Sequence, residues 1–199
     1  MKLSINQSSS LSKNTRHFLT PEGRTMYKID AQINLTTRKT HIYRTFSSMP
    51  EVPLGVTTPD LVENGESYTR IATIEYHQTK PTIFHFEAGK ESCSEHDLFK
   101  GGKNPLNYTY HSREFVGPDG ETYTWKIQVS SETPKLYNRM DEEVAAYDRA
   151  HLGVLSPSPG PATLDIATSV EHMANLIVIT WAFVYGLIEQ TREGFVGTW

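Results

Sequence analysis

The sequence predicts a mainly β protein: a closed antiparallel β-barrel around one central hydrophobic helix near its C-terminal end. Segments in which apolar and polar residues alternate strictly recur along the chain, as in half-buried strands. Only the segment of about 169–192 has a convincing helix pattern, and it is apolar almost all round. A barrel closed around this helix covers both sets of apolar surface and leaves no sheet edge exposed. We expect the 199 residues to form a single domain.

Two phrases of the sequence are nearly alike, "RHFLTPEGRT" at residues 16–25 and "REFVGPDGET" at residues 113–122. Each begins with a short apolar piece and leads into an alternating strand, "YKIDAQINL" after the first and "YTWKIQV" after the second. Proline presets the backbone for a turn, and the glycine two positions later supplies the positive φ that closes a hairpin. The phrases therefore predict two equivalent hairpins of one barrel.

The spacing after each glycine predicts a difference between these hairpins. The apolar face resumes at Tyr27, four residues after Gly23, but at Tyr123, three residues after Gly120. An unmatched residue in a ladder is accommodated by a β-bulge. We therefore expect the two turns to differ and the bulge to sit differently in each.

Other segments follow the strand pattern, and two follow other patterns. Residues 47–65 carry three prolines and are expected to form a projecting loop, while "SEHDLFKGG" predicts one or two helical turns. The further predicted strands are "RKTHIYRTF" (38–46), "SYTRIATIEYH" (67–77), "TIFHFE" (82–87), "LNYTYHSREF" (106–115) and "ATLDIA" (162–167). "EVAAYDR" (143–149) fits a strand or one turn of helix, and we favour the strand.

The helix pattern has start and stop signals of its own. Thr168 and Glu171 have the spacing of a capping box, and Gly194 can end the helix. The apolar run of residues 173–188 is shorter than the roughly 20 residues that a bilayer span needs. A buried helix is therefore favoured, and a C-terminal membrane anchor is kept as the alternative.

Composition restricts the functional class. The formal net charge is −4 and no basic arm stands out, so nucleic acid is not an expected partner. A single cysteine, Cys93, excludes an internal disulfide framework and suits a reducing compartment. The first residues lack the apolar run of a signal peptide. We expect an intracellular, cytoplasmic protein, in one alternative peripheral to a membrane.

Three stretches together carry a resemblance to a known family. "PEGRTMYKI", "SREFVGPDGETYTWK" and "EHMANLIVITWAFVYGLIEQTRE" resemble an uncharacterised domain family that is abundant in mushroom-forming fungi. That family is similar, distantly, to Tubby C-terminal and LURP-one-related domains, which implies a barrel of roughly twelve strands around a hydrophobic helix. The resemblance covers about residues 3–193 and departs in the loop 47–65. In the wider group, Tubby domains bind phosphoinositide head groups and scramblase relatives act at membranes, an analogy of fold only.

A small group of cations is the candidate ligand-binding site. Arg38, Lys39 and Arg44 lie on one predicted strand together with His41, and phosphate groups of a lipid head would find charged donors there. Alternation places Arg38 and Lys39 on opposite faces, so they are not expected to act as one clamp. A solvated strand is the simpler interpretation.

Histidines suggest a second, weaker candidate, a metal or acid–base site. Glu75 and His77 share one face of a predicted strand, and His85 and Glu87 share one face of the next. The alternation alone explains these four as the solvent side of a hairpin, which we favour. His41 and His111 are interpreted as strand surface residues, and His172 as partly buried and hydrogen-bonded. No cofactor motif occurs, and Cys93 has no nucleophile motif around it.

The aromatic residues allow a third kind of site. Tyr108, Tyr110, Tyr123, Trp125 and Trp181 can line a pocket for an apolar ligand, although packing against the helix is the simpler interpretation. The sequence therefore predicts a binding or interaction module whose partner is a lipid head group or a small apolar ligand. An enzyme of small-molecule metabolism, with a pocket at one barrel end, and a tail-anchored membrane protein remain the alternatives.

Overall fold

The computed structural model describes most of the chain in two compact units. The described residues are 1–9, 13–33, 37–46, 59–63, 65–77, 80–87, 91–100, 110–128, 133–150 and 160–192. Residues 5–95 form the unit that we call the N-terminal unit, and residues 1–4 with 96–199 form the C-terminal unit. Each unit is described by itself.

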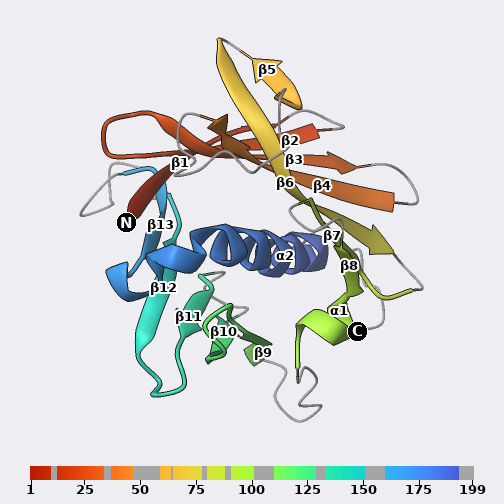
Figure 1. Ribbon diagram of the computed structural model, residues 1–199, viewed down its shortest axis with the longest axis vertical. Helices are drawn as coiled ribbons and strands as arrows, with labels where there is room; N and C mark the ends of the chain where they lie inside the picture. The colour runs from red at the N-terminus through yellow and green to blue at the C-terminus, as the bar shows by residue number, and fades with distance from the viewer. Residues whose placement is uncertain are drawn as a thin grey trace. The chain divides into compact units, whose positions relative to one another are not determined.

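The N-terminal unit is an antiparallel sheet. Strand β1 (Lys2–Ser9) contributes its later residues to it. The other strands are β2 (Lys13–Leu19), β3 (Thr25–Ile33), β4 (Thr37–Thr45), β5 (Leu61–Glu63), β6 (Glu66–His77), β7 (Ile83–Phe86) and β8 (Glu91–Ser94). The long strand β6 pairs with β4 along one side and with β5 and β7 along the other (Figure 1).

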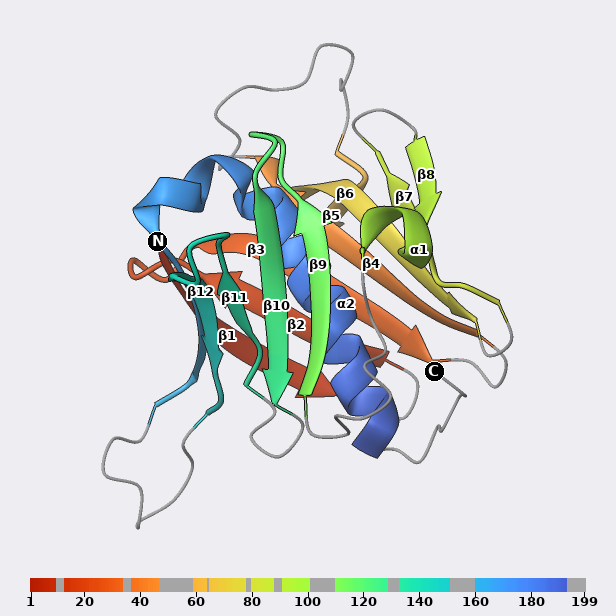
Figure 2. The same ribbon diagram turned by 90° about the horizontal axis from the view of Figure 1, so that it is seen from below.

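The C-terminal unit combines a sheet with the helix that the sequence predicts. Its elements are α1 (Glu95–Leu98), β9 (Tyr110–Val116), β10 (Thr122–Gln128), β11 (Lys135–Tyr137), β12 (Glu143–Asp148), β13 (Ala162–Ile166), a 3₁₀ helix (Thr168–Met173) and α2 (Ala174–Arg192). Strands β9 to β12 run beside α2 in both views (Figures 1 and 2). The mainly β composition and the single long C-terminal helix are therefore as expected.

Hydrogen bonding connects the strands in one series, which is open at its ends. The order is β8-β7-β6-β4-β3-β2-β1-β13-β12-β11-β10-β9, with β5 beside β6. Among the described residues no ladder joins β8 to β9. A closed barrel and a single domain stay predictions.

Four of the strands were not predicted from the sequence. Strands β5, β8 and β11 have only three or four residues each, and β1 is polar at most positions. Such segments become strands because a neighbouring strand supplies backbone hydrogen-bond partners. No residue pattern within the segment itself reveals this pairing. Part of the expected proline loop is strand β5, while residues 47–58 lie outside the described residues.

The two repeated phrases form the predicted hairpins, and their turns are alike rather than different. In the first turn the Thr20 amide donates to the Arg24 carbonyl at 2.8 Å, and in the second the Gly117 amide donates to the Glu121 carbonyl, also at 2.8 Å. Gly23 and Gly120 have φ of 78° and 81°. The expectation of different turns is therefore wrong, because both loops have the same length and the same glycine position.

The bulge does sit differently, as expected. In the second hairpin the register runs without a shift from Val116 through Phe115, which is paired with Tyr123. In the first hairpin it shifts between Phe18 and Leu19, so that Phe18 pairs with Tyr27 and Leu19 with Thr25. The bulge carbonyls of Thr25 and Met26 accept from the Thr45 hydroxyl at 2.8 and 3.2 Å. The shift keeps the Phe–Tyr pair equivalent in both hairpins.

The start of the helical segment differs from the prediction. Ala167 precedes the first turn and makes no side-chain cap, and residues 168–173 form a 3₁₀ helix before α2 begins at Ala174. The predicted capping box is therefore wrong. The Glu171 carboxylate lies 2.5 Å from the amino group of Met1 instead of accepting from a backbone N–H at the start of the helix. Gly194, the expected stop, lies outside the described residues.

Helix α2 is buried as expected, and its contacts in its own unit are mostly aromatic. Every residue from 177 to 188 is buried. Trp181 lies 4.9 Å from Tyr185 and 5.3 Å from Tyr147 between ring centroids, and Phe183 lies 5.1 Å from Phe99. The fully buried Trp125 of β10 donates its indole N–H to the Thr180 hydroxyl at 3.0 Å. The segment 168–189 is long and apolar enough to cross a membrane, but 78% of its most apolar window is buried.

Gly117 is the residue where the second hairpin has no room for a side chain. A Cβ there would lie 2.6 Å from Asp119 Oδ1, 2.8 Å from Tyr123 Cε2 and 3.1 Å from Met173 Sδ. We predict that Gly117→Ala lowers the free energy of unfolding by about 1–3 kcal/mol, as overpacking does. Urea denaturation measures the change.

Gly160→Ala is the matched control for this substitution. No atom lies within 4 Å of a Cβ at Gly160, so the free energy of unfolding should stay within about 0.5 kcal/mol or rise. Equal effects of the two substitutions would contradict the packing argument.

The bond between Trp125 and Thr180 yields a second prediction. Thr180→Val conserves shape but leaves the buried indole N–H without its acceptor, so we expect a loss of about 1–3 kcal/mol in the free energy of unfolding. In a Trp125→Phe background the same substitution should cost less, because no donor is left unsatisfied. A double-mutant cycle in urea measures this coupling, and additive losses would show that the bond contributes nothing.

Candidate functional site

The sheet of the N-terminal unit has an apolar face and a polar face. Residues paired across β3, β4, β6 and β7 share a face, because side chains alternate along each strand. The apolar face is buried and consists of Tyr27, Ile29, Ala31, Ile42, Ala72, Ile74, Tyr76 and Phe84. The polar face includes Lys28, Asp30, Lys39, His41, Thr73, Glu75, His77, His85 and Ser92, and Tyr43 and Ile83 lie on it as well.

The three predicted ligand-binding cations are divided between these faces. Arg38 and Arg44 lie on the apolar face, where each guanidinium carbon is 5.7 Å from a ring centroid, of Tyr76 and Tyr27 respectively. Arg38 is only 9% exposed. Lys39 lies on the polar face, with 44% of its side chain exposed. Of the three, Lys39 is therefore the cation that the polar face presents.

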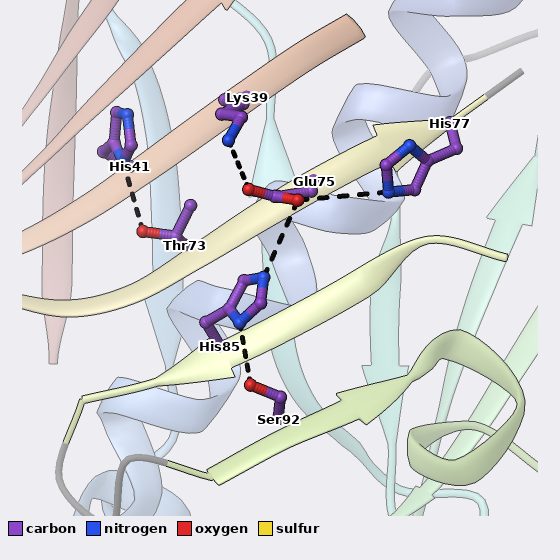
Figure 3. A network of polar contacts seen from close by, with 7 residues as sticks. All are labelled: Lys39, His41, Thr73, Glu75, His77, His85 and Ser92. Carbon is purple, nitrogen blue, oxygen red and sulfur yellow. Dashed lines mark hydrogen bonds and ion pairs between the residues drawn. The ribbon is translucent and has the colours of Figure 1, made fainter. Parts of the chain in front are cut away.

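Glu75 is the centre of a cluster on the polar face (Figure 3). Its Oε1 accepts a hydrogen bond from the Lys39 ammonium on the neighbouring strand. Its Oε2 lies 4.0 Å from His77 Nε2 and 3.8 Å from His85 Nε2. We call these four residues the Glu75 cluster: three nitrogen-bearing side chains from β4, β6 and β7 converge on one carboxylate.

Two hydroxyl groups orient the imidazoles on this face. His85 Nδ1 is 2.7 Å from the Ser92 hydroxyl of β8, and His41 Nδ1 is 3.1 Å from the Thr73 hydroxyl of β6 (Figure 3). Ser92 is the register partner of His85, and Thr73 is that of His41. With Nδ1 engaged by Ser92, the Nε2 atom of His85 is the one that faces Glu75.

The fourth weak metal candidate, Glu87, is not part of the cluster. Its carboxylate accepts from Arg70 Nε at 2.7 Å. Within the described ranges no group of three or more His, Cys, Asp or Glu is placed to hold a metal ion. The geometry of the Glu75 cluster agrees, since its one carboxylate is already bound to an ammonium group, and a cation would be repelled there.

The charges of the cluster act on one another. The hydrogen bond from Lys39 holds the pKa of Glu75 below its ordinary value, and the nearby histidines act in the same direction. Burial and the charges of Arg70 and Lys39 lower the pKa of His41. Glu75 is therefore ionised over the whole range in which histidines titrate.

A buried lysine lies farther along the same face. The side chain of Lys28 is 1% exposed, and its ammonium lies 3.3 Å from Asp30 and also binds Glu63 of β5. Burial alone would lower the pKa of Lys28, but the carboxylates of Glu63 and Asp30 outweigh it and raise the pKa. Asp30 in turn accepts from the Thr15 hydroxyl at 2.8 Å. In this network one ammonium is shared by two carboxylates, and the contact with Glu63 ties β5 to the sheet.

The other predicted residues have structural contacts. In the C-terminal unit Trp125, Trp181 and Tyr123 are buried, which supports packing over a pocket, while Tyr108 and the side chains of Tyr110 and His111 lie outside what the structure describes. His172 is half exposed rather than partly buried, with Nε2 3.4 Å from Asp119. Cys93 is half-buried and faces Phe84 across the ladder from β8 to β7.

Comparison with known proteins places the chain in a family. Residues 10–192 match the model of a family of unknown function, DUF6593. The chain belongs to this family. None of the curated proteins and none of the solved structures matches it.

The DUF6593 match includes both repeated hairpins and every residue of the Glu75 cluster. Sequence reasoning named three members of the cluster as weak candidates but assigned Lys39 to a different site. The strand register would have been needed to connect them, because Lys39 is opposite Glu75 only through the pairing of β4 with β6. Ser92 carried no signal at all, since β8 was not recognised.

The lowered pKa of Glu75 predicts a pH-dependent contribution to stability. The carboxylate stabilises the folded chain above the ordinary glutamate pKa of about 4.3, and this contribution is lost as pH falls through the lower folded-state pKa. Glu75→Gln should therefore reduce the free energy of unfolding at pH 7, by less than about 1 kcal/mol for so exposed a pair. At pH 3 the difference between the variant and the parent should be smaller than at pH 7. Urea unfolding at both pH values measures this, and a constant difference would contradict it.

Proposed function

We propose that the protein is an intracellular, cytoplasmic binding module that attaches to the phosphate-bearing head groups of anionic lipids through the Glu75 cluster. The observation that carries the proposal is the convergence of the Lys39 ammonium and the His77 and His85 imidazoles on one partly exposed patch. Ammonium and imidazolium groups are charge-assisted donors to phosphate oxygens.

The exposure of the cluster suits a ligand that comes from outside. Lys39 and His85 are 44% and 40% exposed, while Glu75 is 25% exposed beneath them. A phosphate can therefore take over donors that now face Glu75 without the sheet opening. Arg38 and Arg44 belong to the other face and are not part of this proposed contact.

The proposal also includes a wider family relationship. We infer that the chain is a Tubby-like domain of fungal origin, with a barrel that closes around α2. An antiparallel strand series and a C-terminal helix that is buried over residues 177–188 support the barrel, since they are the parts that such a barrel needs. Attachment through a membrane anchor is less well supported, because most of the apolar window of α2 is buried. An apolar ligand is less well supported as well, since the ring of Trp181 packs against the rings of Tyr147 and Tyr185.

Vesicle binding tests the proposed function. We predict that the protein sediments with phosphatidylcholine vesicles that contain an anionic phospholipid at pH 5.5, and not with phosphatidylcholine alone. Lys39→Gln should weaken binding about five-fold, since one cation near an anionic surface contributes about 1 kcal/mol.

Lys135→Gln is the matched control. Lys135 is 42% exposed and paired with Glu143 at 2.8 Å, much as Lys39 is paired with Glu75, but it lies in the other unit. Binding should be unchanged by this substitution. The proposed function fails if anionic vesicles bind no better than neutral ones, or if both lysine variants lose affinity equally.

A further inference from the structure

The two imidazoles of the Glu75 cluster have no close hydrogen bond to the carboxylate that they face. The distances from Glu75 Oε2 to the two Nε2 atoms, 4.0 and 3.8 Å, are beyond hydrogen-bond length. His77 and His85 are 28% and 40% exposed. Both imidazoles are therefore within reach of solvent and of an incoming oxygen.

The net charge of the cluster depends on these two histidines. When both are neutral, the positive Lys39 and the negative Glu75 cancel, and the four residues have no net charge. When both are protonated, three positive charges surround one negative charge, and the net charge is +2 by this sum. The lowered pKa of Glu75 keeps the carboxylate ionised in both states. The cluster therefore attracts anions only in its protonated state.

The groups around the cluster do not change this sum. In the described part of the sheet, the charged and titratable side chains on this face or paired with it are Lys28, Asp30, His41, Tyr43, Glu63, Arg70 and Glu87. Arg70 and Glu87 cancel, while Lys28 with Asp30 and Glu63 leaves one negative charge that is the same in both states of the cluster. His41 is disfavoured as a cation by burial and by Arg70 and Lys39. His77 and His85 are left as the groups that change the charge.

We propose that lipid attachment by this protein is gated by acid: the Glu75 cluster binds the phosphodiester head group of an anionic lipid when His77 and His85 are protonated, and releases it when they are neutral. The gate rests on the proposed function and adds a condition to it. Histidine is the side chain whose ordinary titration falls between pH 5 and 8. The Ser92 hydroxyl holds the His85 ring with Nε2 toward the ligand position.

The experiment compares binding at pH 5.5 and pH 7.5 at constant ionic strength. Vesicles of phosphatidylcholine with phosphatidylglycerol are the probe, because a phosphodiester keeps one negative charge at both values. We expect the parent protein to bind roughly ten- to thirty-fold more tightly at pH 5.5, the effect of two added charges near an anionic surface. The double variant His77→Gln with His85→Gln should bind equally at both pH values.

His172→Gln is the matched control, since His172 is a half-exposed histidine beside a carboxylate in the other unit. It should keep the full pH dependence. The single variants His77→Gln and His85→Gln, each with about half the effect on a logarithmic scale, support the gate if the double variant does not fold.

The outcomes separate the gate from the proposed function. Tight binding of the parent at both pH values overturns the gate and leaves lipid attachment standing. A pH dependence that survives in the histidine variants, or that disappears in His172→Gln, overturns the assignment to this cluster. An absence of binding at both pH values overturns the gate and the proposed function together.

Discussion

Burial of an all-apolar helix is the constraint on which the C-terminal unit depends. Residues 177–188 of α2 present no polar face, so each side of the helix must meet apolar surface rather than water. Part of that surface comes from aromatic rings of the same unit, namely Tyr147 of β12 and Phe99. The one polar side chain within this stretch, Thr180, is compensated by its own helix and by Trp125. Strand alternation and helix composition are therefore two consequences of one requirement.

The repeated phrases are part of this scaffold. In both hairpins a buried phenylalanine pairs with a buried tyrosine, and a glycine with positive φ closes the turn. The acidic residue of the turn has diverged: Asp119 accepts from the Tyr123 hydroxyl at 2.7 Å, while Glu22 is exposed. A third hairpin, between β11 and β12, has the same pattern of turn hydrogen bonds: the Asn138 amide donates to the Glu142 carbonyl, and the Asp141 amide donates to the Asn138 carbonyl. Asp141, with φ 62°, takes the place of the glycine. The shared feature is turn geometry.

The N-terminal unit depends on a different balance. One face of its sheet is apolar, and on the other face charged side chains pair with one another in small groups. In the Lys28 network the lysine and Asp30 are buried and in direct contact with their partners, which suits a structural role. The Glu75 cluster is more exposed and leaves two imidazoles at nearly 4 Å from the carboxylate, which suits a group that changes its partners. The Lys28 network and the Glu75 cluster lie on one face, but only the Glu75 cluster has donors that can turn to a new partner. We therefore assign the function to the Glu75 cluster.

Alternation and turn chemistry determined much from the sequence alone: the strands of both hairpins, β4, β6, β7, β12 and β13, the burial of the helix and the separation of Arg38 from Lys39. These are local properties, set by periods of two and 3.6 residues and by proline and glycine. Only the tertiary structure decided the short strands, the 3₁₀ start of the helix and the meeting of Lys39, Glu75, His77 and His85. Those features depend on which strand lies beside which and in what register, and register is set by pairing between segments that are distant in the sequence.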